Sequence, residues 1–189
     1  MNRRGGHGFS LLELLVTLFV VVLVTSLVTL NITSGGRDIE LEAEVNNLAE
    51  TASYALDEAQ LLGVNYGLLL LRAEEDGETV YGYRWLELEN AAWREPASGK
   101  EIFAEHYLPP EYELALELEA VPVAELPMVG AEETIAPQVI LYASGETTEG
   151  AVEVISRQSG ELLWRIEWDL LGRFRLLRRG EEPDLEARG

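Results

Sequence analysis

The sequence contains no cysteine and only two histidines, His7 and His106, among 189 residues. Without cysteine the chain can form no disulfide, no thiolate metal site, no cysteine nucleophile and no lipid-modified cysteine anchor. His106 is the only histidine after the first eight residues, and a histidine-based triad or a two-histidine metal site is therefore hard to build. We expect a non-enzymatic protein without a cofactor or metal, and we expect His106 on the surface or in a loop.

Basic residues are also scarce. There are 14 Lys and Arg against 34 Asp and Glu, the net charge is −20, and Lys100 is the only lysine. Surfaces that bind nucleic acid need clustered basic side chains, so no nucleic-acid partner is expected. The carboxylates follow no EF-hand spacing. Glu132-Glu133 could bind Ca²⁺ weakly, but solvated side chains are the favoured interpretation.

Charge is missing altogether from a long stretch near the N-terminus. Glu13 is the only charged residue between Arg4 and Arg37, and 23 uncharged residues run from Leu14 to Gly36. A helix needs about 20 apolar residues to cross a bilayer. The run is too long for a cleaved secretory signal, and no small-residue cleavage site follows it. We predict a membrane-spanning helix whose basic N-terminal flank stays in the cytoplasm.

A specific motif opens this run. After a short basic leader the sequence reads Gly8-Phe9-Ser10-Leu11-Leu12-Glu13. The arrangement resembles the prepilin leader shared by type IV pilins and type II secretion pseudopilins. The resemblance implies that a prepilin peptidase cleaves between Gly8 and Phe9 on the cytoplasmic face. It also implies N-methylation of the new Phe9 amine.

Glu13 is the candidate subunit-assembly residue. Phe9 and Glu13 are four residues apart and share one helix face, and the helix macrodipole favours a carboxylate near the N-terminus. An unpaired carboxylate in lipid is costly, so such a residue normally has a partner. The natural partner is the charged N-terminal amine of a neighbouring subunit. The alternative is an ordinary anchor with a tolerated glutamate near the interface.

Residues 38–62 are predicted to continue the helix, and Gly63 to end it. Gly35-Gly36 marks a place where the helix could bend or melt locally. We expect the first half of the helix in the membrane or against sibling subunits, and the second half against the chain's own globular domain. Apolar or small residues recur with a period near 3.6, at Leu41, Val45, Leu48, Ala52, Ala55, Ala59 and Leu62.

From residue 63 to residue 179 the pattern is strand-like. Apolar and polar residues alternate between glycine-containing turns such as Asp76-Gly77 and Ser159-Gly160, which is typical of antiparallel sheets. About seven strands are expected, in two packed sheets. The aromatic residues of the alternating stretches, Tyr83, Trp85, Trp164 and Trp168, are predicted to lie in the core. The late arginines, Arg173, Arg175, Arg178 and Arg179, are predicted to form a solvated face, with a subunit contact as the alternative.

The second half of the chain carries a further resemblance. A helix followed by an all-β domain, with Trp93, Leu108-Pro109 and the stretch from Pro137 to Glu146, resembles the GspH/FimT class of minor pseudopilins. The Thr-Pro-Phe that usually follows in that class is replaced here by Thr147-Thr148-Glu149. Residues 120–136 contain Pro122, Pro127 and Gly130 and are expected to form a long, mobile loop.

The expected fold class is α+β, with a long N-terminal hydrophobic helix followed by an antiparallel, β-sandwich-like domain of the pilin type. We divide the chain into a leader (residues 1–8), a transmembrane and assembly half of the helix (9–36), an amphipathic half (37–62), a β domain (63–179) and a polar tail (180–189).

The resemblance implies a minor pseudopilin at or near the tip of a type II secretion pseudopilus, assisting protein export. It would cross the inner membrane once, with its C-terminal domain in the periplasm. The implied partners are the prepilin peptidase, the major pseudopilin, other minor pseudopilins and inner-membrane lipid. One alternative is a minor pilin of a type IV pilus or DNA-uptake fibre. Another is an anchored envelope enzyme or binding protein.

Overall fold

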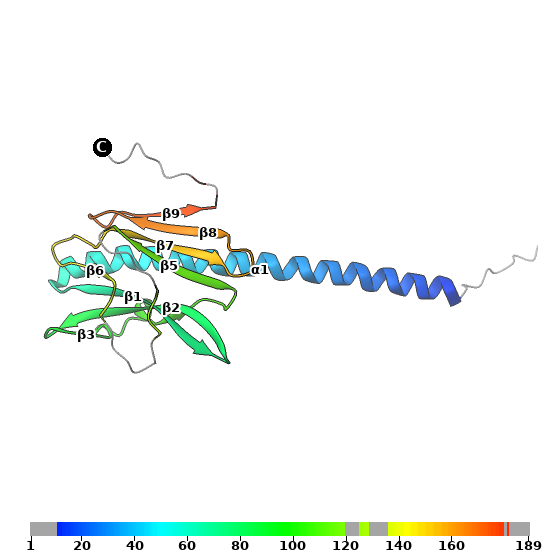
Figure 1. Ribbon diagram of the computed structural model, residues 1–189, viewed down its shortest axis with the longest axis horizontal. Helices are drawn as coiled ribbons and strands as arrows, with labels where there is room; N and C mark the ends of the chain where they lie inside the picture. Colours follow the sequence, from blue (N-terminus) through cyan, green and yellow to red (C-terminus); the bar gives the residue numbers. More distant parts are fainter. Residues whose placement is uncertain (1–10, 120–124, 129–135, 180, 182–189) are drawn as a thin grey trace, which may run out of the picture. The chain divides into compact units, whose positions relative to one another are not determined.

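The computed structural model describes residues 11–119, 125–128, 136–179 and 181, without the side-chain surroundings of residues 25–37. The chain divides into two compact units, residues 1–42 and residues 43–189. The second unit contains the C-terminal part of the helix and all strands among the described residues (Figure 1). A helix followed by antiparallel strands confirms the α+β class.

The helix α1 (Leu11–Leu62) continues through Gly35-Gly36. Its C-terminal end has the predicted form. Gly63 has a φ of +70°, and the N–H groups of Gly63 and Val64 both donate to the carbonyl oxygen of Ala59, at 2.9 and 3.2 Å. A glycine in this left-handed conformation lets the chain satisfy the last helical carbonyls while it reverses.

The C-terminal part of α1 buries the predicted apolar stripe, with one exception. Leu62 is 55% exposed, so its assignment to the stripe is wrong. The chain turns back at Gly63, and Tyr66 reaches back to Glu58, so the domain covers the preceding turns and leaves the last turn open. The buried members of the stripe are Leu41, Val45, Leu48, Ala52, Ala55 and Ala59, joined by Leu56.

The first sheet is antiparallel, with the order β3-β2-β1-β6 and with β4 paired to β2. The hairpin between β1 and β2 turns at Asp76-Gly77, where φ is +50° and +82°, the geometry that matches the twist of paired strands. The strands are β1 (Tyr66–Glu75), β2 (Glu78–Glu89), β3 (Ala92–Arg94), β4 (His106–Tyr107) and β6 (Val139–Leu141).

Strand β1 is buried on both faces from Tyr66 to Leu71. On one face, Tyr83 of the adjacent β2 reaches Glu44 of α1. On the other face, Leu69, Leu71 and Leu86 form a separate cluster against which Trp93 packs. A strand covered on both sides has a continuous apolar sequence instead of an alternating one.

The second sheet is antiparallel in the order β5-β7-β8-β9. In β5, β7 and β8 most even-numbered residues are buried in the core, among them Leu116, Val152 and Ile166, and charged residues alternate with them on the outer face. The predicted core positions of Tyr83, Trp85, Trp164 and Trp168 are confirmed. The strands are β5 (Tyr112–Leu118), β7 (Gly150–Ser156), β8 (Leu162–Trp168) and β9 (Phe174–Arg178), and a short 3₁₀ helix η1 (Glu101–Phe103) precedes β4.

Two sheets were expected and are found, but the described residues contain nine strands, not about seven. The strands missed by the sequence pattern are β3 and β4, of three and two residues, too short for alternation to show. In the predicted loop, residues 125–128 lie against β1, since the N–H of Arg72 donates to the oxygen of Pro127 and its guanidinium pairs with Glu125 at 2.6 Å. Residues 120–124 and 129–135, including Glu132-Glu133, lie outside the described residues, as does almost all of the predicted tail.

The segment from Pro137 to Glu146 packs closely on its surroundings. A Cβ atom on Gly67 of β1 would lie 2.3 Å from Cγ of Pro137, so only glycine fits opposite this proline. Gln138 then bonds both main-chain groups of Leu70 at 2.9 Å, as a neighbouring strand would. Strand β6 and a tight turn at Gly145 follow.

Candidate assembly surface

Glu13 lies in the first turn of α1, as the first acidic residue of the helix. A carboxylate in this position interacts favourably with the partial positive charge of the helix N-terminus. The hydroxyl of Thr17, one turn later, donates to the main-chain oxygen of Glu13. The carboxylate of Glu13 thus sits at the start of an apolar helix, on its exposed surface.

The residues around Glu13 are apolar and exposed. All residues from Leu11 to Val24 are exposed, and Leu11, Leu12 and Phe19 each show more than 60% of their surface. A contiguous apolar surface of this size marks a site for protein or membrane contact, because soluble monomers rarely expose one. The first unit therefore presents a surface that needs a partner outside the chain's own core.

Among the residues that the structure describes, no helix is both long and apolar enough to cross a membrane. The predicted transmembrane half, residues 9–36, falls partly outside these residues, since residues 9–10 and the side chains of residues 25–36 are not included. Gly8 and Phe9 also lie outside the described residues. The pairing of Glu13 with a neighbouring amine stays a prediction.

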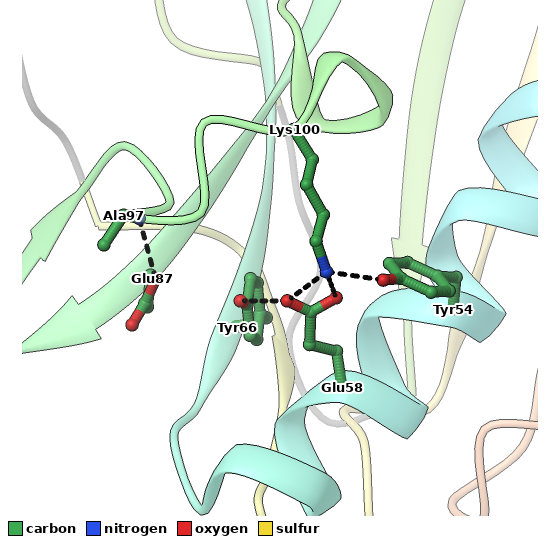
Figure 2. A network of polar contacts seen from close by, with 6 residues as sticks. All are labelled: Tyr54, Glu58, Tyr66, Glu87, Ala97 and Lys100. Carbon is green, nitrogen blue, oxygen red and sulfur yellow. Dashed lines mark hydrogen bonds and ion pairs between the residues drawn. The ribbon is translucent and has the colours of Figure 1, made fainter.

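A polar network that was not predicted connects α1 to the segment before η1 (Figure 2). Nζ of Lys100 lies 2.8 and 2.9 Å from the two carboxylate oxygens of Glu58, and it donates to the hydroxyl of Tyr54 at 2.6 Å. The hydroxyl of Tyr66 donates to the same carboxylate at 3.3 Å. Glu58 is buried, whereas Lys100 is half exposed.

These contacts determine which protonation states the network favours. Burial alone would raise the pKa of Glu58, but the hydrogen bonds from Lys100 and Tyr54 outweigh it and hold this pKa below its usual value. Burial, followed by the nearby charge of Glu58, raises the pKa of Tyr66. Hydrogen bonds to Glu58 and Tyr54 raise the pKa of Lys100. The charged pair is therefore the stable form at neutral pH, and it ties η1 and its flanks to the helix.

A second polar cluster connects α1 to the first sheet. One carboxylate oxygen of Glu44 accepts a hydrogen bond from the hydroxyl of Tyr83 at 2.5 Å and lies 3.1 Å from Nδ1 of His106. The imidazole of His106 stacks on the ring of Tyr83, with centroids 5.2 Å apart. His106 belongs to the short strand β4 and is partly buried, so its prediction as a surface or loop residue is wrong. Burial, followed by the hydrogen bond to Glu44, raises the pKa of Tyr83.

Both polar clusters join distant parts of the chain, the first by an ion pair and hydrogen bonds and the second by close polar contacts, and neither contains the pattern of a catalytic site. Among the described residues, no group of three or more His, Asp and Glu side chains is arranged to hold a metal ion. A signal for the first cluster existed in the sequence, because Lys100 is the only lysine and Glu58 interrupts the buried side of α1. The sequence could not pair them.

The chain is similar to known proteins over nearly its whole length, although no protein-family model matches it. It is 30% identical to the type II secretion system protein H of Aeromonas hydrophila, over 97% of this chain and 100% of that protein. It is 29% identical to the type II secretion system protein H of Pseudomonas aeruginosa, over 82% of this chain and 86% of that protein.

The fold is similar to that of two solved structures. The crystal structure of the minor pseudopilin EpsH from the type II secretion system of Vibrio cholerae matches with a TM-score of 0.57 at 23% identity, over 75% of this chain and 95% of that chain. A second structure of EpsH from the same system matches with a TM-score of 0.54 at 21% identity, over 74% and 98%. At this level of identity the likeness establishes the fold.

Proposed function

This chain belongs to the family of type II secretion system protein H, and on this premise we propose that it is a minor pseudopilin incorporated at or near the tip of a type II secretion pseudopilus. It is a structural subunit and not an enzyme. Its partners include other pseudopilins, because a pseudopilus is built from them. Assistance to protein export follows from this position in the machine.

We propose that a prepilin peptidase cleaves the chain between Gly8 and Phe9 and that the new Phe9 amine is methylated. The motif Gly8-Phe9 with Glu13, after a basic leader and before an apolar helix, supports this. Glycine before the cleaved bond lets the catalytic groups of the peptidase approach the main chain without a side chain in the way.

The proposed assembly contact joins Glu13 of one subunit to the Phe9 amine of a neighbour. Two features support it: the place of Glu13 in the first turn of α1, and the exposed apolar surface from Leu11 to Val24 around it. In such a surface an ion pair is useful mainly because either group left unpaired is costly. The contact would therefore set the axial register between subunits.

The proposed location is the inner membrane, with one pass formed by the first half of α1. Arg3 and Arg4 support a cytoplasmic N-terminus, and the acidic second unit would then lie in the periplasm. Inner-membrane lipid and the major pseudopilin are the proposed surroundings of the apolar segment. The net charge of −20 disfavours the alternative of a DNA-uptake fibre, whose tip would need a basic surface.

The observation that carries this proposal is the similarity to type II secretion system protein H over 97% of the chain. The test is to express the full chain with its sibling pseudopilins and to analyse the membrane fraction by N-terminal mass spectrometry and co-purification. We expect a chain that begins at a methylated Phe9 and co-purifies with other pseudopilins. A chain that keeps Met1, or that purifies alone, would overturn the proposal.

A further inference from the structure

Strand β9 has one free edge. The sheet order places β8 on one side of β9 and, among the described residues, no strand on the other. The N–H of Arg179 donates to the oxygen of Leu163 at 3.1 Å. Main-chain groups alternate in direction along a strand, so odd-numbered residues of β9 point to β8. The N–H and C=O groups of Phe174 and Leu176 therefore point to the open side.

The main-chain groups of Arg178, the next residue on the open side, already bind a glutamate of the same chain. The N–H of Arg178 donates to the side-chain carboxylate of Glu181 at 2.9 Å, and its C=O accepts from the N–H of Glu181, also at 2.9 Å. An acidic residue thus takes both main-chain groups of one edge position. Within the described part of the chain, the same groups of Phe174 and Leu176 have no hydrogen-bond partner, so an added strand can bind them.

The outer face of this edge carries Arg173, Arg175 and Arg179, although the chain has a net charge of −20. Arg173 pairs with Asp169 at 2.6 Å, and Arg179 pairs with Glu161. Arg175 makes no hydrogen bond or ion pair within the described part of the chain. It lies opposite Glu167 of β8 and lines a hollow of about 560 Å³ on the outer face of the sheet, whose walls contain both arginines and carboxylates. A strand added on the open side would place its outward side chains beside Arg175, and an acidic side chain there would give Arg175 an ion-pair partner.

The inner face of the edge is apolar. Phe174 and Leu176 are only half buried, and the ring of Phe174 lies 5.6 Å from that of Trp168. The guanidinium of Arg178 lies over the ring of Trp164, at 5.3 Å, at the end of this surface. A strand that alternates acidic and apolar residues would match both faces of the edge, because side chains alternate along it.

We propose that the free edge of β9 binds an extended segment of a neighbouring pseudopilin in which acidic and apolar residues alternate. The segment would add a strand to the sheet, with its acidic side chains beside Arg175 and its apolar side chains on Phe174 and Leu176. The same arginines disfavour pairing with a second β9, which would bring like charges together. The inference rests on the proposed function, because only an assembled pseudopilus brings such a neighbour close.

The competing explanation is that the arginines only protect an edge strand from pairing, which is a common role of charged residues there. The two explanations differ in one respect. A protective edge stays empty in the assembled fibre, whereas a docking edge has a specific neighbour whose binding depends on the charge at position 175.

Since the chain has no cysteine, a single-cysteine variant can place a photo-crosslinker at one position. We would label Leu177→Cys, on the outer face beside Arg175, in the full chain co-expressed with its sibling pseudopilins. Ala92→Cys, exposed on the edge strand β3 of the other sheet, is the matched control. We expect position 177 to crosslink to an acidic, extended segment of a sibling, identified by mass spectrometry, at least about tenfold more strongly than position 92.

Charge reversal then tests the mechanism. Arg175→Glu in the labelled chain should lower the crosslink about tenfold, and reversal of the mapped acidic residue in the sibling should restore it. Arg94→Glu, an exposed arginine on β3, should leave it unchanged. Equal crosslinking from both cysteines would overturn the inference. Crosslinks formed only with residues 180–189 or with a second copy of this chain would overturn it too. The same holds if the crosslink yield at position 177 does not change in Arg175→Glu.

Co-purification of the unlabelled chain separates this inference from the proposed function. If the chain co-purifies with its siblings but position 177 gives no such crosslink, the inference on β9 is wrong and the proposed function stands. If the chain does not co-purify with any pseudopilin, both are wrong.

Discussion

The two ends of α1 have the same backbone structure and opposite surroundings. In the first unit, Leu15 is 57% exposed within an apolar surface, whereas Leu48 in the second unit is 4% exposed in the core. Helix propensity cannot explain this difference, because both residues are leucine in the same helix. The second part of α1 is stabilised by the chain's own sheets, whereas the first part exposes an apolar surface, for which we propose lipid or sibling subunits as partners.

Each part also contains a carboxylate among apolar residues. Glu58 is held within the chain by Lys100, Tyr54 and Tyr66. For Glu13 we propose a partner in another subunit. On this proposal, the same physical requirement, that a carboxylate away from water needs a cation, is met by folding in one part and would be met by assembly in the other. The following predictions test this contrast.

The largest effect is expected at the cleavage site. Gly8→Val should abolish processing, because a branched side chain before the scissile bond blocks close approach of the peptidase. Without cleavage there is no free Phe9 amine, and incorporation into the pseudopilus should be lost as well. N-terminal mass spectrometry of the membrane fraction is the measurement, with Gly6→Val as the control. A normal Phe9 terminus in Gly8→Val would contradict the proposed cleavage.

The second effect is a loss of assembly in a chain that is still processed normally. Glu13→Val should leave cleavage intact but lower co-purification with sibling pseudopilins by about tenfold or more, since it leaves the neighbouring amine unpaired at a cost of several kcal/mol. Glu13→Asp should be intermediate, because its shorter side chain withdraws the charge. Glu40→Val removes an exposed carboxylate from the same helix and should have no such effect. Normal co-purification of Glu13→Val at normal expression would favour the plain anchor.

The third effect distinguishes the two parts of α1 by how much each contributes to the free energy of unfolding. Leu48→Ala should lower the free energy of unfolding of the second unit by about 2–5 kcal/mol, the usual cost of a cavity in a core. Leu15→Ala should change it by less than about 0.5 kcal/mol, because Leu15 contributes nothing to that core. Denaturation of the full chain in detergent, followed by tryptophan fluorescence, measures both. Equal losses would mean that the apolar segment belongs to the same folding unit.

The smallest effect is a pH dependence. The folded-state pKa of Glu58 is lowered from 4.5, so its charged form contributes stability that is present above that pH and lost as the pH falls through the folded pKa. Glu58→Gln should therefore be less stable than the wild type at pH 7, by about 1 kcal/mol. The difference should shrink below about pH 4. Glu50→Gln, exposed on the same helix, is the control, and a pH-independent difference for Glu58→Gln would contradict the assignment.

The strands were predictable where one face is buried along several residues. In β5 and β8 the alternation of Leu114 with Glu113, or of Trp164 with Arg165, directly reflects a core face and a solvent face. The alternation fails in β3 and β4, which are too short, and the helical period fails at Leu62, the last residue of the helix, which the sheets leave exposed. These features depend on what the rest of the chain covers, which no local pattern contains.

By itself, the sequence determined the candidate processing and assembly residues, because their chemistry depends on neighbours along the chain: Gly8 before Phe9, and Glu13 one helical turn later. Only the tertiary structure decided that Lys100 meets Glu58 across 42 residues, and that β9 ends a sheet with Arg175 beside its open edge. The physical reason is that spacing along a helix fixes which side chains share a face, whereas pairing between distant segments depends on the packing of the whole domain.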